Sequence, residues 1–161
     1  MIRIRPARLQ DFEEITKMYK ELIKTVYKGF HIKEDIFFYG IVQGWYQNNK
    51  TIMTSYEDET EKITGFSLSY VEDVGFCDPY VKGELAYVKE EFRKGKSAFK
   101  LYHHVVELAD NMKMNLVSSG YVGDGAEDKI EQIMSRFGEP FLLEMKRIQG
   151  DKYQKATEKR E

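Results

Sequence analysis

The chain has 161 residues, which is enough for one domain with a sizeable buried core. Hydrophobic residues make up 42% and charged residues 32%, and 11 Tyr and 10 Phe are present, a composition that excludes an intrinsically disordered protein. The formal net charge of −2 provides no basic field that attracts nucleic acid, and the single cysteine, Cys77, excludes an internal disulfide.

A strand and two helices are expected first. The strand MIRIRPA stops at Pro6. A helix is expected to begin at Asp11, because acidic side chains fill its first turn, where the helix dipole favours anions. A second helix is expected over about 33–46, interrupted or curved near Gly40 and Gly44.

The rest of the chain is expected to alternate strands with helices. In order, we expect a hairpin of two strands (51–56 and 63–71), a loop rich in Gly, Asp and Pro (72–83), a strand (84–92), a helix (97–112), a strand (115–122), a short helix (128–137) and a last strand (140–148). This order predicts a mixed sheet flanked by helices. We expect a single domain over 1–148 and a polar tail over 149–161.

The stretch EEFRKGKSAFK places positive charge and small residues at the point where the helix 97–112 is expected to begin. A helix start presents amide hydrogens without intrahelical partners and a partial positive charge, so it binds phosphate well. Cations there are unfavourable unless an anion is bound. We interpret the stretch as a binding site for the phosphate groups of a cofactor. A basic turn without a ligand is the alternative. The residues concerned are Arg93, Lys94, Gly95, Lys96, Ser97, Ala98 and Lys100.

The same stretch resembles the cofactor signature of the GCN5-related N-acetyltransferase (GNAT) superfamily, which is Gln or Arg, two residues, Gly, one residue, then Gly or Ala. In YVKEEFRKGKSA, Arg93 stands at the first position and Ala98 at the last. Lys96 stands where the family has its central glycine, and Gly95 comes one place early, a departure that resembles phage-encoded members. The segments MIRIRPARLQDFEEITKMY, ITGFSLSYV and MSRFGEPFLLEMKRI also resemble family segments in the correct order.

The resemblance implies an α/β fold with a mixed, mostly antiparallel central sheet splayed into a V and flanked by about four helices. Acetyl-CoA would lie in the V, with its pantetheine amides along the strand ELAYV, which holds Tyr87 and Val88. Its pyrophosphate would sit on residues 93–98. The activity implied is direct transfer of the acetyl group from acetyl-CoA to a primary amine of a small molecule or protein.

Two catalytic candidates come from the resemblance. Glu84 heads the cofactor strand, as does the glutamate that serves many members as a base; a solvent-facing strand end is the alternative. The family often has a tyrosine as general acid where this chain has Met134, so Tyr121 on the neighbouring strand is a substitute candidate, with a packing role as the alternative.

Other interpretations stay open. The protein could bind CoA without catalysis, as Lys96 and Met134 would allow, or it could be a partner-binding protein. Modification of a nucleic acid is disfavoured by the charge. His103 and Glu107 are four residues apart, but nothing supplies further ligands, so no metal is expected. We expect a cytoplasmic protein, because neither a signal peptide nor a membrane span is visible; its oligomeric state is open, a homodimer included.

Overall fold

The structure, a computed structural model, describes residues 1–27, 31–33, 35–93 and 95–118. The predicted helix 128–137, strand 140–148 and tail 149–161 lie outside these ranges. The elements are, in chain order, β1 (Ile2–Pro6), a 3-10 turn (Leu9–Asp11), α1 (Phe12–Val26), α2 (Phe38–Gln47), β2 (Thr51–Glu57), β3 (Ile63–Glu72), β4 (Tyr80–Val88), a second 3-10 turn (Glu90–Phe92), α3 (Ser97–Met112) and β5 (Leu116–Ser118).

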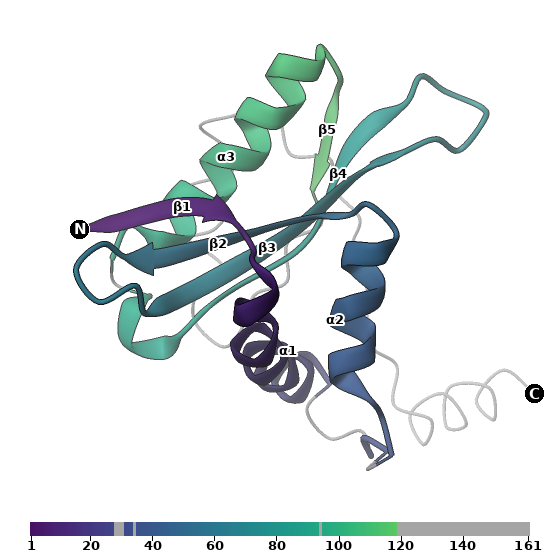
Figure 1. The fold of residues 1–161 in the computed structure, drawn as a ribbon. Coiled ribbons are helices and arrows are strands. Elements are labelled where there is room, and N and C mark those ends of the chain that lie inside the picture. The colour runs from purple at the N-terminus through teal and green to yellow at the C-terminus, as the bar shows by residue number, and fades with distance from the viewer. Residues whose placement is uncertain (28–30, 34, 94, 119–161) are drawn as a thin grey trace, which may run out of the picture.

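The five strands form one sheet in the order β1-β2-β3-β4-β5 (Figure 1). All neighbouring pairs are antiparallel except β4 and β5, which run parallel and pair over Val81–Gly83 and Leu116–Ser118. The predicted mixed, mostly antiparallel sheet is therefore confirmed. How far β4 and β5 separate beyond Ser118 lies outside the described residues.

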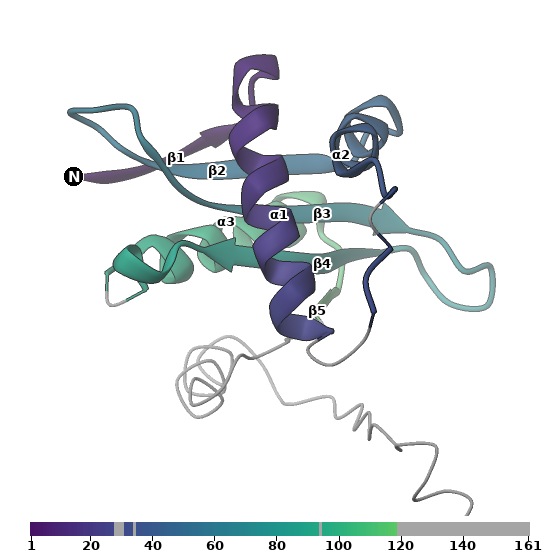
Figure 2. The ribbon, with the colours of Figure 1, turned by 90° about the horizontal axis from the view of Figure 1, so that it is seen from below.

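Helices cover both faces of the sheet. Figure 2 shows α1 and α2 on one face and α3 on the other. On the first face, helix residues with helical spacing pack against alternate residues of β2 and β3; the buried members are Phe12, Ile15, Met18, Val42, Ile52, Ile63, Phe66 and Leu68. On the second face, α3 buries Leu101 against Met53 and Val88, and Val105 and Ala109 against Val81. The described part of the chain thus forms three layers.

The junction between β1 and α1 is held by a buried ion pair. The Arg5 guanidinium contacts the Asp11 carboxylate at 2.5 Å, and their side chains are only 12% and 5% exposed. Asp11 was expected to begin the helix, and it does precede α1, but its carboxylate accepts hydrogen bonds from Arg5 and from the Arg8 amide. Burial acts to raise the pKa of Asp11, but the bonds from Arg5 and Arg8 outweigh it and lower that pKa below its usual value.

Three boundaries differ from the sequence-based expectation. Residues 80–83, expected in a loop, begin β4, because they pair with the end of β3 on one side and with β5 on the other. That strand ends at Val88 and not at residue 92, because the next residues form a 3-10 turn. The second helix begins at Phe38 and runs through Gly40 and Gly44 without a break. By contrast, the predicted helix 97–112 is confirmed at both ends.

A membrane-spanning helix needs about 20 apolar residues, and no helix in the described ranges meets that requirement.

Candidate functional site

The basic turn joins β4 to α3, as the sequence predicts. The chain leaves the sheet at Val88, passes through the 3-10 turn and enters α3 at Ser97, with Lys96 preceding the first helical residue. The side chains of Arg93 and Lys96 are exposed, and Lys94 lies outside the described residues. Two exposed cations therefore accompany the positive end of a 16-residue helix.

The turn uses several of its own amides internally. The amide of Phe92 donates to the carbonyl of Lys89 (2.9 Å), that of Arg93 to Glu90 (3.2 Å), and that of Gly95 to Phe92 (3.0 Å). A side chain at Gly95 would place its Cβ 3.2 Å from the Phe92 carbonyl oxygen, so the small residue suits the turn itself. An anion would consequently meet the amides that follow, at the start of α3, which a helix leaves without intrahelical acceptors.

The Arg93 side chain folds back over the end of β4. Its Nε donates to the Val88 carbonyl at 3.0 Å, and its guanidinium carbon lies 5.6 Å from the centre of the Tyr87 ring. This leaves the two terminal nitrogens of an exposed guanidinium to face an anion. Arg93 thereby connects the turn to the last two residues of the strand that the sequence analysis assigned to the cofactor.

Tyr87 and Val88 point to opposite faces of the sheet. Tyr87 packs against the α1–α2 face, and Val88 packs against Met53 and Leu101 under α3. This alternation is the one expected for a strand. The backbone groups of Tyr87 face β3, as does the Lys89 amide, which donates to Thr64, so a ligand along the free edge of β4 would meet the backbone of Val88.

Ser97 has a structural partner. Its hydroxyl is fully buried and lies 3.2 Å from the Thr64 hydroxyl, which donates to the Ser55 hydroxyl at 2.8 Å. A chain of three buried hydroxyls therefore anchors the first residue of α3 to β3 and β2. Ser97 can contribute its backbone amide to an anion, but its side chain is occupied. Ala98 packs beside it against the cluster that contains Leu101.

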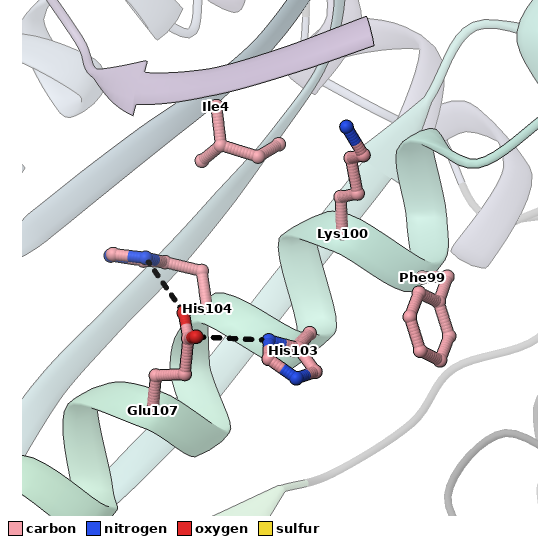
Figure 3. Close-up of a pocket in the computed structure, with 6 residues that line it drawn as sticks. All are labelled: Ile4, Phe99, Lys100, His103, His104 and Glu107. Carbon is pink, nitrogen blue, oxygen red and sulfur yellow. Dashed lines mark ion pairs between the residues drawn. The ribbon is translucent and has the colours of Figure 1, made fainter.

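The Lys100 side chain points away from the turn, contrary to the interpretation that it is one of the cations around the phosphate site. Its ammonium donates to the Ile2 carbonyl, on the side of α3 that faces β1. That side carries a shallow cavity of about 230 Å³, lined by Ile4, Phe99, Lys100, His103, His104 and Glu107 (Figure 3).

Within this cavity, the two histidines contact the same carboxylate. His103 Nδ1 lies 3.3 Å and His104 Nδ1 3.9 Å from the two oxygens of Glu107, as Figure 3 shows. No group of three or more His, Cys, Asp or Glu side chains in the described ranges is arranged to hold a metal ion.

Glu84 occupies a bulge in β4. Leu68 pairs with Leu85 and Ser69 with Gly83, so Glu84 is the extra residue between them. Bulges redirect side chains, and here the carboxylate turns toward Lys50, whose ammonium donates to it at 2.8 Å. Their side chains are 35% and 24% exposed.

Glu84 also lies close to α1. Burial raises the pKa of the Tyr19 hydroxyl in α1, and the charges of Tyr27 and Glu84 add to that effect. The candidate base directly precedes Leu85, which packs against the α1–α2 face of the sheet, and its carboxylate is held by an ion pair with Lys50. The second catalytic candidate, Tyr121, lies outside the described residues, as does Met134.

Sequence reasoning missed Lys50 altogether. It lies between α2 and β2, and its amide donates to the Trp45 carbonyl at 3.0 Å. It is 34 positions from Glu84 in the chain, and only the pairing of β2, β3 and β4 brings the two together. No local pattern around Lys50 signals this contact.

Comparison with known proteins shows a shared fold. No family model and no curated protein sequence matches the chain. Among solved structures, the aminoglycoside N-acetyltransferase AAC(6')-Iy, bound to a bisubstrate analogue, CoA-S-monomethyl-acetylneamine, matches with a TM-score of 0.67 at 19% identity, covering 92% of this chain and 99% of that one.

Two further solved structures match over a similar length. A mutant of the BH1408 protein from Bacillus halodurans has a TM-score of 0.70 at 17% identity, covering 91% of this chain and 99% of that one. The aminoglycoside acetyltransferase meta-AAC0020, from an uncultured soil metagenomic sample, has 0.64 at 15% identity, covering 92% and 96%. These likenesses confirm the predicted GNAT-like fold, while the resemblance to phage-encoded members stays a prediction.

Proposed function

We propose that the protein is a CoA-dependent N-acetyltransferase that moves an acetyl group from acetyl-CoA to a primary amine. The observation that carries the proposal is the position of two exposed cations, Arg93 and Lys96, at the start of α3 directly after β4. The fold adds support, because AAC(6')-Iy has this fold and binds CoA. Fold alone does not define an activity, so the proposal depends on the turn.

The chain's residues fit a pyrophosphate. Arg93 and Lys96, with Lys94 between them, would neutralise its charge, and the amides from Lys96 to Ala98 would donate to its oxygens. Gly95 and Ala98 keep the approach free of bulky side chains. The free edge of β4 up to Val88 would bind the amides of the pantetheine arm, with Tyr87 beside it.

Glu84 would hold the acceptor amine and take its proton. Bound acetyl-CoA supplies the thioester carbonyl that a neutral amine attacks. The Glu84 carboxylate, on the bulge of β4, can position the amine and accept the proton as the new C–N bond forms. Because the Lys50 ammonium occupies that carboxylate, the acceptor has to displace it. Tyr121 is the proposed proton donor to the departing thiolate.

The acceptor is an amine of a small molecule or a protein. AAC(6')-Iy and meta-AAC0020 are aminoglycoside acetyltransferases, which makes amines with several amino groups a natural starting panel. We also propose a cytoplasmic location.

Two measurements test the proposed function in sequence. CoA should raise the melting temperature of the folded protein, because a ligand that binds the folded state stabilises it. Acetyl-CoA with an amine panel should then release free thiol at a rate that depends on the amine. Binding of CoA without thiol release would refute catalysis. If the protein shows no CoA binding and no thiol release, the whole proposal is refuted.

A second candidate function is CoA binding without catalysis. The ion pair between Glu84 and Lys50 favours it, because the Lys50 ammonium already occupies the carboxylate that would bind the amine. The thiol-release measurement separates the two functions.

A further inference from the structure

The ion pair of Glu84 belongs to a larger group of side chains on the same face of β3 and β4. We call it the Tyr70 cluster; its members are Lys50, Tyr70, Glu72, Tyr80, Lys82 and Glu84. The Lys50 ammonium lies 4.1 Å from the centre of the Tyr70 ring, and the Lys82 ammonium lies 5.7 Å from it. Lys82 forms an ion pair with Glu72 at 3.0 Å, and the Tyr80 hydroxyl donates to Glu72 at 2.9 Å.

The strand register produces this arrangement. Tyr70 pairs with Lys82 and Glu72 with Tyr80 across β3 and β4, so their side chains share one face. Lys50 directly precedes Thr51, which pairs with Ser69, so it reaches Tyr70 from the other side. Two ammonium groups thus flank one aromatic ring.

The charges of the Tyr70 cluster cancel. It holds two lysines and two glutamates, and each glutamate already has a lysine within 3.0 Å. The four charged side chains are between 24% and 35% exposed, so their ion pairs are partly shielded from water. A ligand with several positive charges would find no unbalanced carboxylate here and would meet the repulsion of both lysines.

We propose that the acceptor carries an anionic group, such as a carboxylate, close to its amine. This inference rests on the proposed acetyltransferase function and names the substrate class of the same site. Such an acceptor exchanges ion pairs without leaving a charge unpaired: its ammonium replaces Lys50 on Glu84, and its carboxylate receives the displaced Lys50. Lys82 lies 5.7 Å from the centre of the same Tyr70 ring as a second cation.

Lys50 suits this exchange. Its backbone is fixed by the hydrogen bond to Trp45, while its four-carbon side chain can move its charge from one carboxylate to another. An amine without a carboxylate would leave the displaced Lys50 ammonium unpaired beside the ammonium group of the acceptor. Lys50 is therefore a specificity-determining residue, and Glu84 is the group that receives the amine.

The test compares amines that differ only in the carboxylate. Thiol release from acetyl-CoA is measured with lysine against cadaverine, tyrosine against tyramine, and phenylalanine against 2-phenylethylamine. In the wild-type protein, we expect at least one amino acid to have a kcat/KM at least tenfold above its decarboxylated partner. In Lys50→Met that ratio should collapse, in Lys50→Arg it should be retained, and in Lys24→Met, a surface lysine on α1, it should be unchanged.

Comparing the kcat/KM ratio of each amine pair between the wild type and Lys50→Met cancels intrinsic differences in amine reactivity, because both proteins are assayed with the same amines. The inference is overturned, and acetyl transfer stands, if the decarboxylated partners or a polycationic aminoglycoside react equally well or better. It is also overturned if Lys50→Met leaves every ratio unchanged. Absence of thiol release with every amine refutes the transfer reaction and the inference with it.

Discussion

The Ser97 hydroxyl, at the first residue of α3, lies 3.2 Å from the Thr64 hydroxyl in β3. This contact fixes where the helix begins relative to the sheet, and so it positions the amides and cations of the turn. Thr64 also donates to Ser55, which makes it the centre of a buried chain.

Replacing Thr64 by Val should therefore destabilise the protein and weaken CoA binding together. The isosteric change leaves two buried hydroxyls without their partner, which costs about 2 kcal/mol. Denaturant unfolding measures the loss, and titration with CoA measures the affinity. Thr64→Ser keeps the hydroxyl and should retain most of both. If Thr64→Val is as stable as the wild type, the hydroxyl chain does not hold α3.

Charge reversal at the turn should abolish most CoA affinity. We expect Arg93→Glu to weaken CoA binding by at least tenfold, because it removes two donors and adds repulsion beside the pyrophosphate. Lys100→Gln is the matched control, since the Lys100 ammonium contacts the Ile2 carbonyl in the edge strand β1. Isothermal titration should show an unchanged CoA affinity for this control. An equal loss in both variants would mean that the turn has no special role.

Glu84→Gln should separate chemistry from binding. We expect kcat to fall by about 100-fold, because the amine loses the group that accepts its proton, while CoA affinity stays within twofold. Glu21→Gln, on the exposed part of α1, is the control. Rates equal to those of the wild type would remove Glu84 as the base.

Gly65→Ala should destabilise the sheet beside the cofactor strand. A Cβ there would lie 2.6 Å from the Tyr87 carbonyl oxygen, which is backbone and cannot rotate away. Overpacking of this kind costs about 2 kcal/mol. Gly44→Ala is the control: nothing lies within 4 Å of its Cβ, and removing a glycine from α2 should stabilise the helix by about 0.5–1 kcal/mol. The two melting temperatures should move in opposite directions.

The Arg5–Asp11 pair should make stability depend on pH. Because the folded-state pKa of Asp11 is lowered, its contribution is present above its unfolded pKa, roughly pH 4, and is lost as the pH falls through the folded value. Asp11→Asn leaves Arg5 without its partner and should cost about 3 kcal/mol at pH 7.

The difference between Asp11→Asn and the wild type should shrink as unfolding is measured from pH 5 downward. Glu13→Gln, which breaks an exposed pair with Lys17, should change stability little at any pH. A constant difference between Asp11→Asn and the wild type across this range would contradict the assigned role of the carboxylate.

The sequence predicted those elements whose pattern is local. The helix 97–112 has a continuous apolar stripe, and its buried residues Leu101, Val105 and Ala109 follow it. The start of β4 was missed, because Lys82 and Gly83 have little strand preference and join the sheet only through β3 and β5. Tertiary pairing decided that boundary.

The candidate site was predictable to the same extent. The segment 93–98 is contiguous, so its charge, its small residues and its place before α3 could be read from the sequence, although the buried contact of Ser97 with Thr64 could not be inferred. The Glu84–Lys50 pair joins residues 34 positions apart, and the bulge that aims Glu84 depends on the register of two strands. No local sequence pattern could therefore predict the contact between Glu84 and Lys50.

Calorimetric titration of the folded wild-type protein with CoA, carried to millimolar concentration, tests the central claim most directly. We predict saturable binding of one CoA per chain, weakened at least tenfold by Arg93→Glu. An absence of binding by a folded sample, or equal binding by wild type and Arg93→Glu, would contradict it.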